Sequence, residues 1–327
     1  MNRMNIRRTR AVVLGASGFI GTRLVRRLSE QHAAVVAVDI EPPRERLDGV
    51  EYAVADVRER LAPELGAGAQ TLYNLAAIHR TPGHLPHEYY EANVLGAVNA
   101  TQLADDCDIP LIVFTSSISV YGPSEAALTE QSPLRPTSDY GRSKRIAETI
   151  HRNWVHTGGE RRLVTVRPGV VFGPGERGNY THLAKALRRR IFAYPGRKDT
   201  VKSGGHVDEL LRCIEFAIGQ CEREVVFNFA FPDESTTAAI VSTFSRVAGY
   251  PSAYPTVPAG PLLAAASLFE AANAVGVRNP VHRARVMKLM NSTRVAPAWL
   301  LASGYQFERD LERSLTEWAE ETAWRFD

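Results

Sequence analysis

The chain has 327 residues, of which 44% are hydrophobic and 23% charged, as in an ordinary globular protein with room for one large α/β unit or two lobes. Its 39 basic and 36 acidic residues leave a net charge of +3, which argues against nucleic acid as a partner. The three cysteines are an odd number without metal-ligand spacing, so we expect a reducing, cytoplasmic location and no metal site. Residues 1–10 are basic but precede no apolar signal segment, which predicts a frayed leader.

A glycine-rich turn follows the first predicted strand, residues 11–14, and opens a helix with apolar spacing over residues 19–28. The turn reads Gly15-Ala16-Ser17-Gly18-Phe19-Ile20-Gly21. Amides at a helix N-terminus favour an anion, and glycines let the backbone approach a pyrophosphate. Taken alone, such a turn could be an ordinary loop, but its strand and helix favour a dinucleotide site.

The next predicted strand, residues 35–39, ends in Asp39, eighteen residues past Gly21. A carboxylate at this position accepts hydrogen bonds from the adenosine ribose hydroxyls and repels a 2′-phosphate. We therefore expect NAD rather than NADP, a preference that the nearby Arg44 and Arg46 would weaken.

Strands and helices continue to alternate up to Arg167. The further predicted strands are 51–55, 71–77, 110–116 and 163–167, and the helices between them include 88–105 and 138–156. This alternation predicts an α/β fold with a doubly wound parallel sheet, whose ligands lie at the carboxyl ends of the strands. We expect a Rossmann domain over 10–174, a returning strand near 225–231 and a smaller capping lobe over 175–327.

Tyr140 and Lys144 stand four residues apart on the predicted helix 138–156 and so share one face of it. A nearby cation favours the phenolate, which would make Tyr140 an acid/base group for interconverting an alcohol and a ketone. The alternative is a surface helix with an incidental aromatic residue. Tyr194 and Lys198 repeat the spacing, but the proline and glycine between them predict a loop. Hydroxyl residues at 115–119, just past a predicted strand, would face the same crevice.

These segments together resemble the extended short-chain dehydrogenase/reductase family, in the branch of NAD-dependent sugar epimerases and dehydratases. The resemblance runs through the glycine turn, Asp39, Asp56-Val57, Asn74-Leu75-Ala76-Ala77, Ser116-Ser117, Tyr140 with Lys144, and residues 167–175. It departs from the family pattern at Ser203-Gly204-Gly205.

The resemblance implies roles for particular residues. The catalytic trio would be Ser117, Tyr140 and Lys144, supported by Asn93, for which a purely structural role is also open. Cofactor-binding residues would be Gly15, Ser17, Gly18, Phe19, Ile20, Gly21, Asp39, Asp56, Val57, Leu75, Ala76, Ala77, Asn93, Tyr140, Lys144, Pro168, Val170 and Val171.

Ile118 and Ser119 stand where related 4,6-dehydratases carry an Asp-Glu pair, so neither dehydration nor decarboxylation is expected. The resemblance then implies a 4-epimerase of a diphosphate-linked sugar, carried by a nucleotide or a polyprenyl chain. His79, Ser117, Arg177, Asn179 and Lys202 would contact that substrate. A reductase or dehydrogenase of a hydrophobic alcohol or keto sugar is the alternative, and a catalytically idle NAD-binding regulator is a third reading.

The apolar stretch 259–276 is too short to span a bilayer. We expect it to form a helix buried in the capping lobe. The alternative is a half-exposed helix, which would contact a membrane peripherally.

The resemblance implies a homodimer that pairs helices 88–105 and 138–156 with their copies. The isolated histidines 79, 206 and 282 lack metal-ligand partners in the sequence.

Overall fold

The computed structural model describes residues 9–31, 33–43, 45–80, 83–274 and 283–327. Leader residues 1–8, Arg44 and His282 lie outside these ranges. The chain forms two compact units, and it passes between them several times. The first unit comprises Met1–Val120, Leu134–Arg167 and Leu211–Phe227, and the second comprises Tyr121–Pro133, Pro168–Leu210 and Asn228–Asp327.

The first unit is built on a seven-stranded sheet of order β11-β7-β5-β4-β1-β2-β3, which confirms the predicted doubly wound α/β fold. The strands are β1 (Arg10–Leu14), β2 (Ala34–Asp39), β3 (Val50–Val54), β4 (Thr71–Asn74), β5 (Leu111–Thr115), β7 (Arg162–Pro168) and β11 (Glu224–Phe229). The pairs β1–β2, β1–β4, β2–β3, β4–β5 and β5–β7 are parallel. The predicted strand 71–77 ends earlier, at Asn74.

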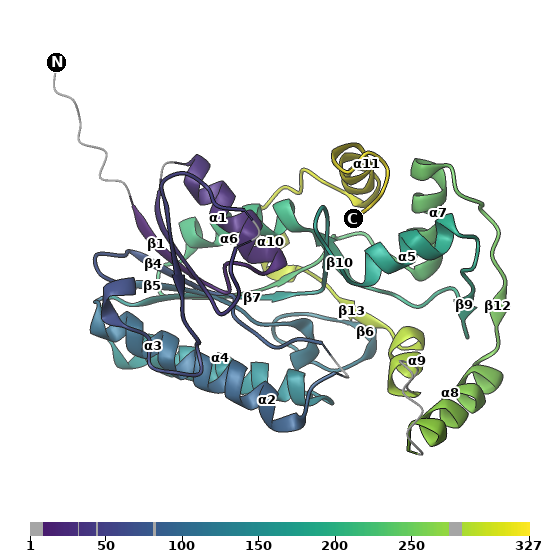
Figure 1. Cartoon of the computed structure of the whole chain (residues 1–327), viewed down its shortest axis with the longest axis horizontal. Helices are drawn as coiled ribbons and strands as arrows, with labels where there is room; N and C mark the ends of the chain where they lie inside the picture. Colours follow the sequence, from purple (N-terminus) through teal and green to yellow (C-terminus); the bar gives the residue numbers. More distant parts are fainter. Residues whose placement is uncertain (1–8, 32, 44, 81–82, 275–282) are drawn as a thin grey trace. The chain divides into compact units, whose positions relative to one another are not determined.

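The central strands are continuous apolar runs. This is expected because helices cover both faces of the sheet, so the side chains on both faces are buried. Val12, Val36, Leu72, Ile112 and Phe114 are all buried in one core. Helix α1 (Phe19–Glu30) lies on one face of the sheet, and α3 (Gly96–Asp106) and α4 (Asp139–Thr157) lie on the other (Figure 1). Short 3₁₀ turns, η1 (Pro63–Leu65) and η3 (Ile118–Val120), complete the connections.

The predicted helix 88–105 lies within an unbroken helical run from Pro86 to Asp106, which contains one π-helical turn that the sequence did not predict. The chain forms α2 (Pro86–Tyr90), then a π-helical turn, η2 (Glu91–Leu95), and only then α3. Apolar periodicity does not distinguish five-residue from four-residue hydrogen-bond spacing over a single turn. Such π-helical turns are frequent at functional sites, and this one carries Asn93.

The second unit contains the remaining elements. They are β6 (Ser124–Leu128), β8 (Val170–Phe172), α5 (Asn179–Arg188), β9 (Tyr194–Pro195), β10 (Gly204–His206), α6 (Val207–Gln220, which continues into the first unit), α7 (Thr237–Ala248), β12 (Thr256–Val257), α8 (Ala259–Ala274), α9 (Arg283–Met290), β13 (Thr293–Val295), α10 (Ala298–Ala302) and α11 (Leu311–Glu321). Its aromatic core includes Phe172, stacked on Tyr180 with ring centroids 4.2 Å apart, together with Phe244, Trp318 and Phe326.

Two predictions concern segments of this unit: a loop at residues 194–198, which is confirmed, and a buried helix at residues 259–276, which is confirmed only as a helix. Tyr194 to Lys198 is not helical: β9 ends at Pro195, and Gly196 has φ +76°. The stretch 259–274 is helical as expected, but the prediction of a buried helix is wrong, because Pro261, Ala264, Ala265 and Phe269 are exposed. Over the described part of the chain, no helix is long and apolar enough to cross a membrane.

Candidate active site

The glycine turn between β1 and α1 forms a tight cradle at the carboxyl ends of the strands. Gly15 has φ +82°, and a Cβ there would lie 2.7 Å from the backbone nitrogen of Ala76. A Cβ at Gly21 would collide with the carbonyl oxygen of Gly15. The N-terminus of α1 begins at Gly18, an N-cap residue without a side chain. The backbone geometry therefore fits a pyrophosphate group bound at a helix N-terminus.

Asp39 ends β2 beside this turn. Its carboxylate accepts hydrogen bonds from the backbone N–H groups of Ser17 (2.9 Å) and Glu41 (3.1 Å). These bonds fix the carboxylate beside the glycine turn. The guanidinium of Arg46 lies over the ring of Tyr52, with its carbon 5.2 Å from the centroid.

Asp56 and Val57 follow β3, and both have partners within the protein. The Arg58 guanidinium donates to both carboxylate oxygens of Asp56 and holds the pKa of that carboxyl below its usual range. The carbonyl oxygen of Val57 accepts a hydrogen bond from the Asn99 amide (2.8 Å).

Tyr140 and Ser117 are brought together by the close approach of α4 to the end of β5. Ser138 caps α4 by accepting a hydrogen bond from the Gly141 N–H (3.1 Å). A Cβ at Gly141 would collide with the carbonyl oxygen of Ser119, so only glycine lets the helix start here. The Ser117 hydroxyl then reaches the Tyr140 phenol, and this hydrogen bond acts to lower the phenol's pKa.

Lys144 belongs to the same helix, and its side chain is fully buried. Its ammonium donates to the carbonyl oxygen of Thr115 (2.8 Å) and lies 4.8 Å from the centroid of the Phe114 ring. Burial lowers the pKa of Lys144 to about 7, while the nearby Glu148 opposes this shift. At neutral pH the lysine is therefore only partly charged.

The expected lowering of the Tyr140 pKa by Lys144 is wrong for the protein on its own. Burial raises the pKa of the phenol above its usual value, and only the hydrogen bond from Ser117 acts against it. The physical reason is that the buried ammonium bonds to Thr115 and Phe114 and is itself partly neutral.

Asn93 links three parts of this region. Its amide oxygen accepts from the Ile78 N–H (3.0 Å), and its amide nitrogen donates to the Ile78 carbonyl (3.1 Å) and the Ser143 hydroxyl (2.8 Å). The side chain thus joins the exit of β4 to the residue preceding Lys144. Leu75, Ala76 and Ala77 lie on that exit, half-buried, and His79 is exposed just beyond Ile78.

Glu148 and Arg167 form a buried ion pair that the sequence reasoning missed as part of the site. Arg167 donates to both carboxylate oxygens of Glu148, at 2.9 and 2.7 Å, and the Ser116 hydroxyl donates to one of them at 2.5 Å. Ser116 precedes Ser117, so the ion pair holds the strand end that presents the Ser117 hydroxyl. The sequence feature that could have indicated this ion pair is the position of Glu148, four residues after Lys144 and therefore on the same face of the helix.

His151, another turn along α4, was also missed. It stacks on Phe114 with ring centroids 4.2 Å apart, and its Nδ1 donates to the Ala147 carbonyl (2.8 Å). Its Nε2 is then the acceptor for the Asn74 amide, 3.3 Å away. Burial lowers the pKa of His151 to about 4. The neutral imidazole packs against the Phe114 ring, which also contacts the Lys144 ammonium.

The predicted substrate residues Arg177, Asn179 and Lys202 belong to the second unit, as do Pro168, Val170 and Val171. Arg177 and Asn179 are exposed around the start of α5. The buried Glu176 lies beside them and accepts a hydrogen bond from the Thr181 N–H at 2.9 Å. An anion bound by α5 would share this N-terminus with the carboxylate.

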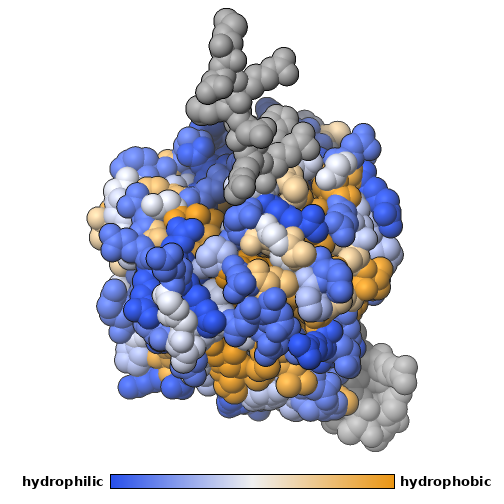
Figure 2. All heavy atoms as spheres, turned by 90° about the vertical axis from the view of Figure 1, so that its left-hand side faces the viewer, coloured by the Kyte–Doolittle hydropathy of each residue, from blue (hydrophilic) through white to orange (hydrophobic). Residues whose placement is uncertain are grey.

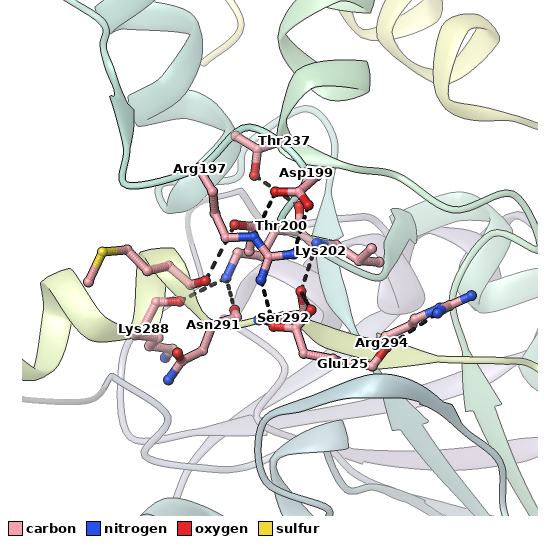
Figure 3. A network of polar contacts seen from close by, with 12 residues as sticks. Glu125, Arg197, Asp199, Thr200, Lys202, Thr237, Lys288, Asn291, Ser292 and Arg294 are labelled. Carbon is pink, nitrogen blue, oxygen red and sulfur yellow. Dashed lines mark hydrogen bonds and ion pairs between the residues drawn. The ribbon is translucent and has the colours of Figure 1, made fainter. Parts of the chain in front are cut away.

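Lys202 occupies a polar network (Figure 3). Its ammonium donates to the carbonyl oxygens of Lys288 (2.8 Å) and Asn291 (2.6 Å), and burial lowers its pKa to about 8. Two of its three N–H donors therefore bind the end of α9.

The departure at Ser203-Gly204-Gly205 has a packing reason. A Cβ at Gly205 would lie 2.6 Å from the ring of Phe229, so that ring occupies the space of a side chain here. The Ser203 hydroxyl accepts from the Val295 N–H at 3.0 Å. His206, which follows, is buried with its ring edge toward Phe172.

Comparisons with known proteins agree with this geometry. The NAD dependent epimerase/dehydratase family matches residues 11–229. The N-acetyl-alpha-D-glucosaminyl-diphospho-ditrans,octacis-undecaprenol 4-epimerase of Escherichia coli O157:H7 is 32% identical over 209 residues, covering 63% of this chain and 62% of that protein. The short-chain dehydrogenase/reductase family 42E member 1 of Xenopus laevis is 27% identical over 215 residues, covering 61% and 56%. The chain thus matches about six-tenths of these relatives' length.

Among solved structures, the UDP-glucose 4-epimerase of Thermus thermophilus, determined with NAD, superimposes with a TM-score of 0.76 at 19% identity. The match covers 96% of this chain and 99% of the other, and it shows a shared fold. The glycine cradle, the buried Tyr140–Lys144 helix and the family match over most of the chain lead to one conclusion. The chain belongs to the NAD dependent epimerase/dehydratase family, whose cofactor is NAD.

Proposed function

We propose that this protein is an NAD-dependent 4-epimerase of a diphosphate-linked sugar, working through a 4-keto intermediate. The observation that carries the proposal is the placement of Ser117, Tyr140 and Lys144 at the carboxyl end of β5. The glycine cradle and Asp39 would hold NAD, with its adenosine ribose at Asp39.

The chain's own residues divide the proton chemistry between them. NAD, when bound, supplies a hydride acceptor and donor at C4 of the sugar. Tyr140 accepts the proton of the C4 hydroxyl and later returns it, while Ser117 holds that oxygen by a hydrogen bond. Lys144, in its protonated form, favours the phenolate. Glu148 and Arg167 keep the Ser116-Ser117 strand end in place.

An epimerase must also hold the sugar's carrier while the keto sugar presents its other face. Arg177 and Asn179 are exposed donors suited to a diphosphate, and Lys202 has one further N–H to offer. His79 is exposed one residue past Ile78, which the Asn93 side chain binds, and we propose that it contacts the sugar.

A reductase or dehydrogenase is the second candidate, favoured by the 27% identity to a short-chain dehydrogenase/reductase. Cofactor retention separates the two functions. An epimerase regenerates its NAD at each turnover and holds it through purification, whereas a reductase must release it. A regulator would bind NAD and turn over none of the sugars.

The decisive experiment incubates the purified protein, without added cofactor, with UDP-glucose, UDP-N-acetylglucosamine and polyprenyl-diphosphate-linked N-acetylglucosamine. We expect the C4 epimer of at least one of them, detected by chromatography or NMR. Tyr140→Phe should lower the rate by about 10²- to 10⁴-fold and leave NAD bound. Tyr194→Phe, at the other tyrosine followed by a lysine four residues later, is the control and should keep full activity. An active Tyr140→Phe variant, or no epimer from any substrate, would refute the proposal.

We also propose a cytoplasmic homodimer. Leu95 and Val98 on η2 and α3 and Ile146 on α4 are exposed apolar side chains, and a groove of about 300 Å³ next to Ile146 is lined by Tyr90, Pro136 and Arg142. Figure 2 shows a hydrophobic patch near the lower edge of its face, the edge along which α3 and α4 run in Figure 1. All three cysteines lie in the described part of the chain and form no disulfide, which supports a reducing compartment.

A further inference from the structure

Three charged side chains are buried together on one face of α4. Lys144 and Glu148 stand four residues apart on the helix and so share that face, and Arg167 of β7 binds Glu148 there. Their exposed fractions are 1%, 7% and 3%. Two cationic side chains therefore share one carboxylate away from solvent, where charges are weakly screened and an unbalanced charge is costly.

The Glu148 carboxylate binds groups other than the Lys144 ammonium. Its oxygens accept hydrogen bonds from Arg167 at 2.9 and 2.7 Å and from the Ser116 hydroxyl at 2.5 Å. The ammonium donates instead to the carbonyl oxygen of Thr115 at 2.8 Å. Glu148 therefore acts on Lys144 through space, and its negative charge opposes the effect of burial on the lysine's pKa.

The other titratable groups around Lys144 are neutral or have partners of their own. On α4 itself, burial lowers the pKa of His151 to about 4 and raises that of the Tyr140 phenol, so both are uncharged at neutral pH. The π-helical turn η2 contributes Asn93, which carries no charge. The acidic residues on α2, η2, α3 and the start of α4 face other groups: Glu88 faces His84, Glu91 faces Arg58, Asp105 faces Arg161, Asp106 faces Arg60 and Asp139 faces Arg142.

We propose that the Glu148–Arg167 ion pair sets the charge of Lys144. The carboxylate stabilises the buried ammonium, and the guanidinium bound to that carboxylate offsets part of the attraction. The consequence for catalysis rests on the proposed function, in which a protonated Lys144 favours the phenolate of Tyr140. In this role Glu148 and Arg167 are positioning residues, which act through the lysine.

The two members of the ion pair act on Lys144 in opposite directions. Without the carboxylate, two cations would be buried together, and Lys144 would lose its proton more readily. Without the guanidinium, the attraction of Glu148 for the ammonium would no longer be offset, and the lysine would hold its proton more firmly. A role in packing alone predicts no such opposition, because the loss of either partner would loosen the end of β5 in the same way.

The test is an NMR titration of the full-length protein labelled with carbon-13 at the lysine Cε. The chain has five lysines, so the spectrum holds few signals, and Lys144→Met identifies that of Lys144. In the wild type we expect its midpoint at about pH 7. Glu148→Gln should lower the midpoint and Arg167→Met should raise it, each by about one pH unit or more.

Each single variant leaves a buried charge without its partner and therefore costs stability. The double variant Glu148→Gln/Arg167→Met leaves neither charge. Its Lys144 midpoint should lie below that of the wild type, because the attraction is lost, and above that of Glu148→Gln, because the repulsion is lost too. Glu215→Gln and Arg27→Met are the controls. They break an ion pair of the same kind between α6 and α1, with a nitrogen–oxygen distance of 2.5 Å, and should leave the midpoint unchanged.

An unchanged Lys144 midpoint in the double variant would overturn the proposal. So would a shift in the same direction in both single variants, or an equal shift in the controls. The titration reads the lysine and does not depend on the reaction. In an active epimerase, the pH above which kcat falls should move with the midpoint. If the midpoints shift as expected and no C4 epimer forms from any substrate, the proposed function fails while the control of the Lys144 charge stands.

Discussion

At the scale of single residues, two buried bases on α4 have pKa values far from those of the free side chains. Lys144 and His151 lie seven residues apart, and both contact the Phe114 ring: the ammonium lies 4.8 Å from its centroid, and the imidazole stacks on it with centroids 4.2 Å apart. Burial lowers the pKa of the first to about 7 and of the second to about 4. Each group therefore binds a proton more weakly in the folded protein than in the unfolded chain.

His151 makes stability fall in acid. Between about pH 6.5 and pH 4 the unfolded chain binds a proton that the folded protein does not, so the free energy of unfolding decreases as the pH falls through this window. A shift of this size corresponds to about 3 kcal/mol. In His151→Gln, urea unfolding at pH 7 and pH 4.5 should show a smaller acid-induced loss than in the wild type. His182→Gln, at an exposed histidine of α5, is the control, and an equal acid-induced loss in the wild type and in His151→Gln would contradict the assignment.

At the scale of elements, the start of α4 decides the geometry of the site. The helix begins against the 3₁₀ turn after β5, and contact at Gly141 sets the distance between the Tyr140 phenol and the Ser117 hydroxyl. The π-helical turn η2 then holds the same helix through Asn93 and Ser143. Both contacts act on the backbone that carries Tyr140 and Lys144.

Gly141→Ala should separate Tyr140 from Ser117. The new methyl group would collide with the Ser119 carbonyl, so the first turn of α4 must move. We expect a fall in kcat of at least ten-fold with NAD binding retained, because a small misplacement of a reacting group is costly and the glycine cradle is untouched. Gly159→Ala is the control, since a Cβ at that position meets no atom within 4 Å. Equal kcat in the two variants would show that the contact at Gly141 does not position the tyrosine.

The elements that the sequence predicted well are those with local causes. The strands at 11–14, 35–39 and 110–116 are apolar runs, and they form β1, β2 and β5 within one or two residues. The Glu148–Arg167 ion pair joins residues nineteen positions apart on a helix and a strand, and only the sheet order brings them together. The exposure of α8 was mispredicted for a related reason. Composition indicates that a helix prefers an apolar environment without showing which molecule provides it.

At the scale of the whole molecule, the proposed dimer would bury the apolar side chains of α3 and α4. A two-fold interface places each residue near its own copy or near a partner residue, so one substitution acts twice. Ile146→Lys would bring two added charges into an apolar interface. Light scattering at micromolar concentration should show a dimer for the wild type and a monomer for Ile146→Lys. Leu301→Lys, on the second unit, should remain dimeric, and a monomeric wild type would refute the dimer.

The late position of β11 in the chain has a consequence for synthesis. β7, its neighbour in the sheet, is complete at Pro168, but β11 begins only at Glu224, roughly 55 residues later. At about 5–20 residues per second, the ribosome takes about 3–11 s to make that stretch. During this interval the nascent sheet exposes the unpaired edge of a buried, apolar strand, which is a hazard for aggregation. We therefore expect a fragment ending near residue 174, which lacks β11, to aggregate more readily than the full chain, as sedimentation of the two would show.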